Sequence, residues 1–178
     1  MSTQARHPSA EALRAAFDAT FAAPPAGERP AVEDFLALRI GGDGYAARLL
    51  DAKGLVAGCR PVPLPSPQPE LFGLFAIRGA IVPVYGASLL LGYPRPALDA
   101  YWLLLCGEDD GRVALAFEEF DGFFQAGRED VCEVPADEGR PHAHVVATVT
   151  HREAVRSVVS IASLLGAIRR GVEATRTR

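Results

Sequence analysis

The sequence predicts a mainly β protein with little helix. About nine or ten short apolar segments are separated by turns rich in glycine, proline and aspartate, at the spacing typical of small barrels and sandwiches. The chain has 178 residues, of which 49% are hydrophobic and 22% charged. This composition is typical of a globular protein that buries its own core without disulfides or metal ions. The three cysteines lie far apart and lack CxxC spacing, which fits a reducing compartment.

Charge and hydropathy exclude several kinds of protein. The formal net charge is −4 and arginine pairs gather only near the C-terminus, which argues against a nucleic-acid-binding protein. No apolar run approaches the roughly 18 residues of a membrane-spanning helix. The first residues contain no apolar core of a secretory signal. We therefore expect a soluble cytoplasmic protein without direct membrane insertion.

Residues 1–33 are expected to form an N-terminal extension that carries a short amphipathic helix. Leu13, Phe17 and Phe21 recur at i, i+4 and i+8, and Pro24-Pro25 ends this pattern. Two interpretations remain open. The helix packs on the protein's own body or frays, or its aromatic residues dock in the groove of a partner.

The first β segments follow directly. Phe35–Ile40 predicts a strand, Gly41–Gly44 a tight hairpin turn and Tyr45–Leu50 the returning strand. Leu55-Val56 predicts a third strand. Five alternating prolines between residues 61 and 69 cannot donate backbone hydrogen bonds, so we interpret them as an extended polyproline-like crossing. A ligand for a proline-binding domain is the alternative.

The chain is organised around Leu71–Pro94, LFGLFAIRGAIVPVYGASLLLGYP. This stretch predicts a strand, a tight turn at Arg78-Gly79, a second strand over Ala80–Tyr85 and a short helix at Leu89–Leu91. Arg78 is a lone cation among mostly apolar residues. Its guanidinium must therefore find a partner or present itself to one.

The second half of the chain predicts further strands and a closing helix. Asp109–Gly111 and His151–Glu153 each predict the turn of a hairpin. Residues 125–141 are polar and predict a loop. The helix is expected to begin at Ser160 or Ser163. The expected strands are Tyr101–Cys106, Arg112–Phe117, Gly122–Phe124, Val145–Val149 and Val155–Ile161.

No specific catalytic constellation is present in the sequence. The chain lacks a GxGxxG sequence, a phosphate-binding loop and a GxSxG elbow. Ser88 and Ser163 have no histidine near them in sequence. His142 and His144 form an HxH pair that could reach one metal ion, but no further ligand follows at motif spacing. Neighbouring acidic residues fit turns better than general acid–base catalysis. We predict no catalytic residue, no metal and no cofactor.

From Asp34 to Ile168 the chain resembles the CheW-like domain of bacterial chemotaxis coupling proteins. The resemblance is most specific in LFGLFAIRGAIVPVYGASLLLG, which is similar to the family signature GLxNLRGxIxPVxDLxxLLG. DFLALRIGGDGYAARL resembles the opening hairpin, GRVALAFEEFDGF a later hairpin, and AVRSVVSIASLLGAI the closing strand and helix.

The resemblance implies two small five-stranded β-barrels packed side by side, with a few short helices, a C-terminal helix and no catalysis. It implies a CheW-like domain over residues 34–170, followed by a flexible tail over residues 171–178. Such modules are adaptors of bacterial two-component signalling that couple the cytoplasmic tip of a methyl-accepting chemoreceptor to a CheA-like histidine kinase. The expected partners are therefore the receptor tip and either the kinase or another CheW-like adaptor.

Carried over position by position, the resemblance implies two interaction surfaces. In the family, the arginine at the position of Arg78 pairs with an acidic residue. The position of that acidic residue is occupied by Gly54 in this chain. We therefore expect Arg78 to pair with another carboxylate or to be exposed. The receptor-facing residues, in the groove between the barrels, are Ala52, Gly54, Leu71, Phe72, Phe120 and Phe123. The kinase-facing residues are Arg78, Gly79 and Ile81.

Several polar positions of the family pattern are replaced in this chain. Ala76 stands at the signature asparagine, Gly86 at the signature aspartate and Ala147 at a glycine of the closing hairpin. The apolar positions remain. This favours, as an alternative, an accessory homologue that binds the receptor or another adaptor without kinase coupling. A small metal-binding or enzymatic barrel that uses His142 and His144 is a third alternative.

Overall fold

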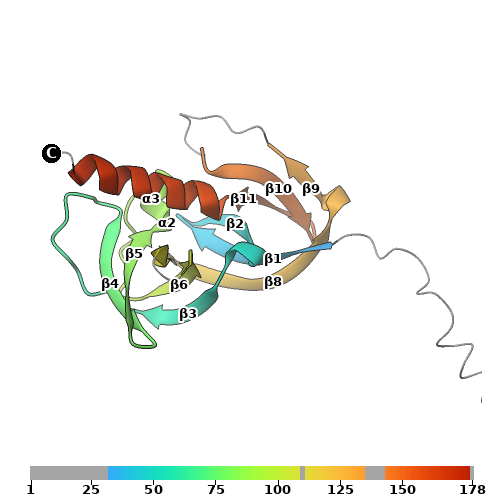
Figure 1. The fold of residues 1–178 in the computed structure, drawn as a ribbon. Coiled ribbons are helices and arrows are strands. Elements are labelled where there is room, and N and C mark those ends of the chain that lie inside the picture. The colour runs from blue at the N-terminus through green and yellow to red at the C-terminus, as the bar shows by residue number, and fades with distance from the viewer. Residues whose placement is uncertain (1–31, 109–110, 135–142, 177–178) are drawn as a thin grey trace, which may run out of the picture. The chain divides into compact units, whose positions relative to one another are not determined.

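The computed structural model describes residues 32–108, 111–134 and 143–176, and within them two curled sheets are formed (Figure 1). The strands are β1 (Val32–Ile40), β2 (Asp43–Arg48), β3 (Gly54–Cys59), β4 (Leu71–Ile77), β5 (Ala80–Gly86), β6 (Tyr101–Cys106), β7 (Val113–Phe117), β8 (Glu119–Gly127), β9 (Val131–Glu133), β10 (Val145–His151) and β11 (Ala154–Val159). The helices are α2 (Ala87–Leu90) and α3 (Ile161–Arg176), with 3₁₀ turns η1 (Leu49–Asp51) and η3 (Arg128–Asp130).

The first sheet has the order β8-β1-β2-β11-β10-β9, and the second has the order β3-β6-β7-β5-β4. The expected mainly β fold of two small barrels with a C-terminal helix is confirmed. The first sheet has six strands rather than five, because the short strand β9 pairs with β10.

The two sheets share one strand pattern. In the first sheet, the hairpins β1–β2 and β10–β11 are joined by a parallel pair of β2 and β11. In the second sheet, the hairpins β4–β5 and β6–β7 are joined by a parallel pair of β5 and β7. In each sheet, one curved segment pairs with both outer strands of the two hairpins. In the first sheet, the segment from β8 to β9 pairs with β1 and β10; in the second, residues 54–62 pair with β6 and β4. Each sheet is thereby closed into a small barrel.

Two-residue turns set three of the hairpins. In Gly41-Gly42, Arg78-Gly79 and Arg152-Glu153 both residues have positive φ, between 47° and 88°. Turns of this kind match the right-handed twist of paired antiparallel strands. The two glycine-containing turns are confirmed where the sequence predicts them. Arg152-Glu153 adopts the same backbone without glycine, because the pairing of β10 with β11 on both sides imposes it.

The proline-rich crossing closes the second barrel. Val62 and Leu74 exchange two backbone hydrogen bonds, N–H to O, of 2.8 and 2.9 Å. Gly73, with φ of 143°, allows this approach, since a Cβ on it would overlap the Val62 carbonyl oxygen. Pro61 and Pro63 have no backbone N–H, so within this three-residue stretch Val62 is the residue that can donate a backbone hydrogen bond. The crossing is thus paired with β4 at Val62, and the polyproline-like conformation of the residues that follow stays a prediction.

Strands that lie between two apolar layers explain the continuous apolar runs of the sequence. In β1, Leu36 faces the space between the sheets, whereas Phe35 faces the interior of the first barrel. In β6, Leu104 faces the space between the sheets and Leu103 the interior of the second barrel. We call the cluster between the sheets the central core. Its buried members are Leu36, Leu38, Ile40, Tyr45, Ala47, Tyr85, Ala87, Leu91, Leu104, Cys106, Leu115, Phe117, Val159, Ile161, Leu164 and Ile168.

Strand β8 runs from Glu119 to Gly127, where the sequence predicts a strand only over Gly122–Phe124 and a loop from residue 125. Its pairing with β1 shifts register, since Ala37 opposes Gly122 and Leu38 opposes Phe120. Asp121 is therefore the extra residue of a β-bulge. Residues 125–127 end this strand and β9 follows, so the predicted loop over residues 125–141 is wrong in its first part.

Two arginines from other strands hold the bulge. Arg39 Nε of β1 donates to Asp121 at 3.2 Å, and Arg156 Nη2 of β11 donates to its other oxygen at 2.7 Å. The Arg156 side chain passes over Gly44 of β2, where a Cβ would lie only 3.2 Å from the guanidinium. Arg156 Nη1 also donates to the Leu38 carbonyl of β1 at 3.4 Å, so this side chain links β11 to β1 and β8 across β2.

Helix α3 covers the central core. The Ser160 Oγ accepts a hydrogen bond from the Ser163 N–H at 3.2 Å, so of the two predicted caps, Ser160 and Ser163, the structure has Ser160. Ile161, Leu164 and Ile168 lie in the central core. The chain stays helical to Arg176, where the sequence predicts a flexible tail from residue 171. The predicted N-terminal helix falls outside the described residues.

Replacement of Gly86 by alanine is expected to destabilise the second barrel. The Phe72 ring lies against Gly86, and an added Cβ would overlap it. Such overpacking costs about 1–3 kcal/mol, so Gly86→Ala should lower the free energy of unfolding by that amount in urea denaturation. Gly111→Ala is the matched control, because no atom lies within 4 Å of its added Cβ. Equal stability of the two variants would contradict this packing.

Candidate functional site

Three aromatic side chains from two different sheets meet at one border of the central core. Trp102 of β6 contacts Phe120 of β8 with ring centroids 5.3 Å apart, and Phe120 contacts Phe123 at 5.0 Å. Trp102 and Phe120 are partly buried against the central core, whereas Phe123 is 64% exposed. We call these three residues the aromatic edge. Contact between the rings holds the exposed one in place.

The bulge at Asp121 creates the aromatic edge. Residues three apart on a regular strand point to opposite faces of a sheet. Because Asp121 is an extra residue, Phe120 and Phe123 oppose Leu38 and Leu36 of β1, and both of these leucines face the central core. The two phenylalanines therefore lie on one face. The ion pairs that hold Asp121 also fix the aromatic edge.

The other residues expected to face a receptor differ in what they pack against. Ala52 and Leu71 are partly buried and border the central core, as Phe120 does. Gly54 begins β3 opposite Leu105, whose side chain would lie 3.2 Å from an added Cβ. The structure thus places Ala52, Leu71 and Phe120 at the border of the central core, and Phe123 lies beside Phe120.

Phe72 is a core residue rather than a surface residue. It is 2% exposed, and its ring packs on Tyr101 with centroids 5.3 Å apart, inside the second barrel. The Arg95 guanidinium lies 4.1 Å from the ring centre. The side chain of Phe72 is therefore not available to a partner. It also fills the space beside Gly86, where the family signature has an aspartate.

Trp102 is the residue of the aromatic edge that sequence reasoning missed. YWLLLC is apolar throughout, so its residues could not be assigned to an inner or an outer face. The alternation of side chains along a strand could have identified it. Trp102 shares a face with Leu104 and Cys106, because residues two apart point to the same side, and both of these lie in the central core.

The turn between β4 and β5 presents the residues expected to face a kinase. Arg78 and Gly79 are exposed at the tip, and Ile81 is 72% exposed just beyond it. Within the described residues, Arg78 has neither an ion pair nor a hydrogen bond. Of the two expectations for this arginine, exposure is observed and pairing with a carboxylate is not.

His144 has a structural partner. Its Nδ1 lies 2.8 Å from the Ser163 Oγ, and its carbonyl accepts a hydrogen bond from the Ser160 N–H. Both contacts hold the first turn of α3. Burial, and secondarily the charge of Arg170, lower the pKa of His144 below its usual value. His142 lies outside the described residues, and no group of three potential metal ligands occurs within them.

Two acidic side chains of the β7–β8 corner serve the backbone and the bulge. Glu118 accepts a hydrogen bond from the Gly41 N–H at 3.2 Å, and its burial raises the pKa of the carboxyl group. Partial burial also acts to raise the pKa of Asp121, but the hydrogen bonds and charges of Arg156 and Arg39 lower it overall. Both carboxylates are thus engaged in holding strands together.

In the part of the chain that the structure describes, no helix has the length and apolar character needed to span a membrane.

Comparison with known proteins agrees with this architecture. The family model of the CheW-like domain matches residues 34–169. Among solved structures, the chain is similar to that of the scaffolding protein TtCheW from Thermoanaerobacter tengcongensis, with 13% identity and a TM-score of 0.65. That match covers 76% of this chain and 92% of the other. No curated protein matches the sequence.

The stability contributed by the α3 cap is expected to depend on pH through His144. Its pKa is lower in the folded protein, so the unfolded chain binds more protons below about pH 6.5 and stability falls as the pH drops through this range. His144→Asn keeps a polar partner for Ser163 but does not titrate. Urea denaturation at about pH 7.5 and 5.0 should show the wild type losing more stability than the variant. Equal losses would contradict this assignment.

Proposed function

Because the chain belongs to the CheW-like domain family, we propose that it is a non-enzymatic adaptor of a bacterial chemosensory pathway. In this role it couples the cytoplasmic tip of a methyl-accepting chemoreceptor to a CheA-like histidine kinase. The observation that supports the proposal best is the aromatic edge, where Phe123 is 64% exposed although Phe120 and the central core hold its strand rigidly. An exposed aromatic residue on a rigid scaffold is typical of a binding surface.

The aromatic edge is the proposed receptor-facing surface. A receptor tip is helical, and an apolar stripe on a helix can pack against Phe123 and Trp102. Ala52 and Leu71 also border the central core, and we include them, with Gly54, in the proposed receptor-facing surface. Phe72 is left out because it is buried.

The tip of the β4–β5 hairpin is the proposed kinase-facing surface. Ile81 supplies an exposed apolar contact, and the Arg78 guanidinium has no partner among the described residues. An exposed guanidinium can bind a carboxylate of a partner through two parallel hydrogen bonds. Gly79 allows the positive φ that the turn requires.

An accessory role without kinase coupling is the second candidate. It is favoured by the loss of polar groups at positions of the family pattern: Gly54 supplies no carboxylate that could pair with Arg78, and the exposed Ala76 supplies no amide. The space beside Gly86 is filled by the buried Phe72 ring. The scaffold is thus kept while polar groups that could set a kinase contact are missing. Residues 1–33 remain a proposed extension to the domain.

Phe123→Glu is expected to weaken binding of a receptor signalling tip by about tenfold or more, since a carboxylate in an apolar contact must be desolvated. Titration calorimetry of the full chain with the purified tip at roughly micromolar concentrations measures this. Val155→Glu is the matched control, because Val155 is 65% exposed and lies on β11. Unchanged binding by the Phe123 variant would contradict the receptor-facing assignment.

Arg78→Ala and Ile81→Glu are expected to weaken binding to the kinase regulatory domain, again by about tenfold, while leaving receptor binding unchanged. Arg152→Ala is the control, since Arg152 is exposed in the same position of an equivalent turn, with φ of 47° against 49° for Arg78. If the wild type binds the receptor but not the kinase, the accessory role replaces the coupling role. Binding to neither partner would refute both.

A further inference from the structure

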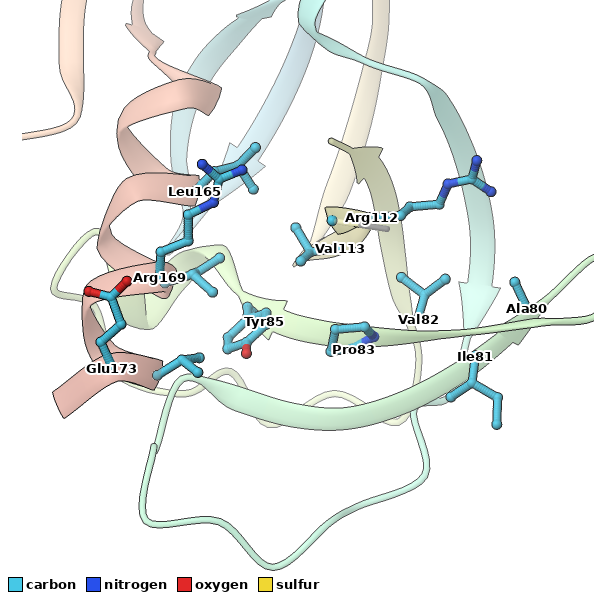
Figure 2. A pocket seen from close by; sticks show the side chains of 13 residues that line it. Ala80, Ile81, Val82, Pro83, Tyr85, Arg112, Val113, Leu165, Arg169 and Glu173 are labelled. Carbon is cyan, nitrogen blue, oxygen red and sulfur yellow. The ribbon is translucent and has the colours of Figure 1, made fainter. Parts of the chain in front are cut away.

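A groove lies between α3 and the outer face of β5, on the second barrel (Figure 2). Its volume is about 600 Å³. Figure 2 shows Leu165 and Arg169 on α3 at the left of the groove, and Val113 and Arg112 farther to the right, above β5. Pro83 and Tyr85 of β5 form part of the floor.

The groove exists because α3 covers only part of β5. Ile81, Pro83 and Tyr85 are two residues apart and lie on the outer face of the strand. Tyr85 is buried in the central core, Pro83 is half-buried, and Ile81 is 72% exposed. The exposed fraction of these side chains therefore rises from Tyr85 toward Ile81, and α3 leaves the apolar surface at Pro83 and Ile81 uncovered.

The occupant of this groove cannot be an added strand. Strand β5 is hydrogen-bonded to β4 on one side and to β7 on the other, so its backbone has no free edge. On the helix side, Leu165, Arg169 and Val172 recur at i, i+4 and i+7, and Ile168 and Glu173 complete the stripe that lines the groove. A stripe with this spacing fits a second helix packed along α3.

The charges of the stripe complement a copy of the same stripe. Arg169 and Glu173 are both exposed and lie one helical turn apart. When two such helices pack antiparallel about a two-fold axis that crosses between these residues, each arginine lies opposite the glutamate of the other copy. Val172, half-buried and next to the axis, then enters the apolar part of the other groove.

We propose that a second copy of this chain occupies the groove, and that the protein forms a two-fold symmetric dimer through antiparallel α3 helices. This goes beyond the proposed adaptor function and leaves the aromatic edge free. Ile81 lies in the groove and also in the proposed kinase-facing tip. The variants below therefore change α3 alone, and they are tested on the full chain without receptor or kinase.

Sedimentation velocity and light scattering of the full chain test the dimer. The weight-average mass should rise from 18.9 kDa toward twice that value as the concentration increases from about 1 to about 200 µM. Arg169→Glu and Glu173→Arg should each weaken dimerisation by about tenfold, because each variant places like charges at both symmetry-related contacts. The double variant R169E/E173R exchanges the charges and should dimerise within about threefold of the wild type.

Arg170→Glu is the matched control, since it reverses the same charge at the next residue of α3, which does not line the groove. It should dimerise like the wild type. A thermal unfolding midpoint close to that of the wild type identifies each variant as folded. A chain that stays monomeric throughout, single variants that dimerise normally, or a double variant that does not recover would each overturn the proposal.

Discussion

The two barrels depend on one shared apolar layer, the central core between the sheets. Any strand that faces this layer also faces the interior of its own barrel, so it must be apolar on both faces. β1, β6 and β7 satisfy this requirement, with neighbouring residues such as Leu103 and Leu104 assigned to different clusters. Burial of each large apolar side chain contributes about 1.5–3 kcal/mol, so the layer and α3 above it are strongly favoured together. The relative position of the sheets follows from this burial.

The same layer determines where an apolar surface can remain exposed. Trp102 and Phe120 end the central core at one border, and Phe123 continues it into solvent. This continuation depends on Asp121, whose insertion into β8 turns Phe120 and Phe123 to one face. Arg39 and Arg156 hold that carboxylate from two other strands, so the proposed binding surface is positioned by ion pairs that do not belong to it.

Closure of both barrels is the reason that the proposed interaction surfaces lie on a helix face, a turn tip and a barrel border. The segment from β8 to β9 closes the first barrel, and the bridge at Val62 closes the second. Closed barrels offer few free strand edges for a partner to extend. Apolar contact is instead available at the aromatic edge, at the β4–β5 tip around Ile81, and along the groove beside α3. An adaptor that must contact more than one protein at once can use such separate surfaces.

The sequence by itself determined the features that depend on neighbouring residues. Gly41-Gly42 and Arg78-Gly79 predict turns because glycine tolerates positive φ. A cap at Ser160 or Ser163 is predicted because a serine hydroxyl can accept the N–H three residues on, and Ser160 is the one observed. Only the tertiary structure decided which of two similar phenylalanines faces solvent. Phe72 is buried and Phe123 exposed, since each strand's neighbours and one inserted residue set the facing of its side chains. It also decided that His144 meets Ser163 and that Arg156 meets Asp121, because contacts between residues far apart in sequence arise only when the strands between them have paired.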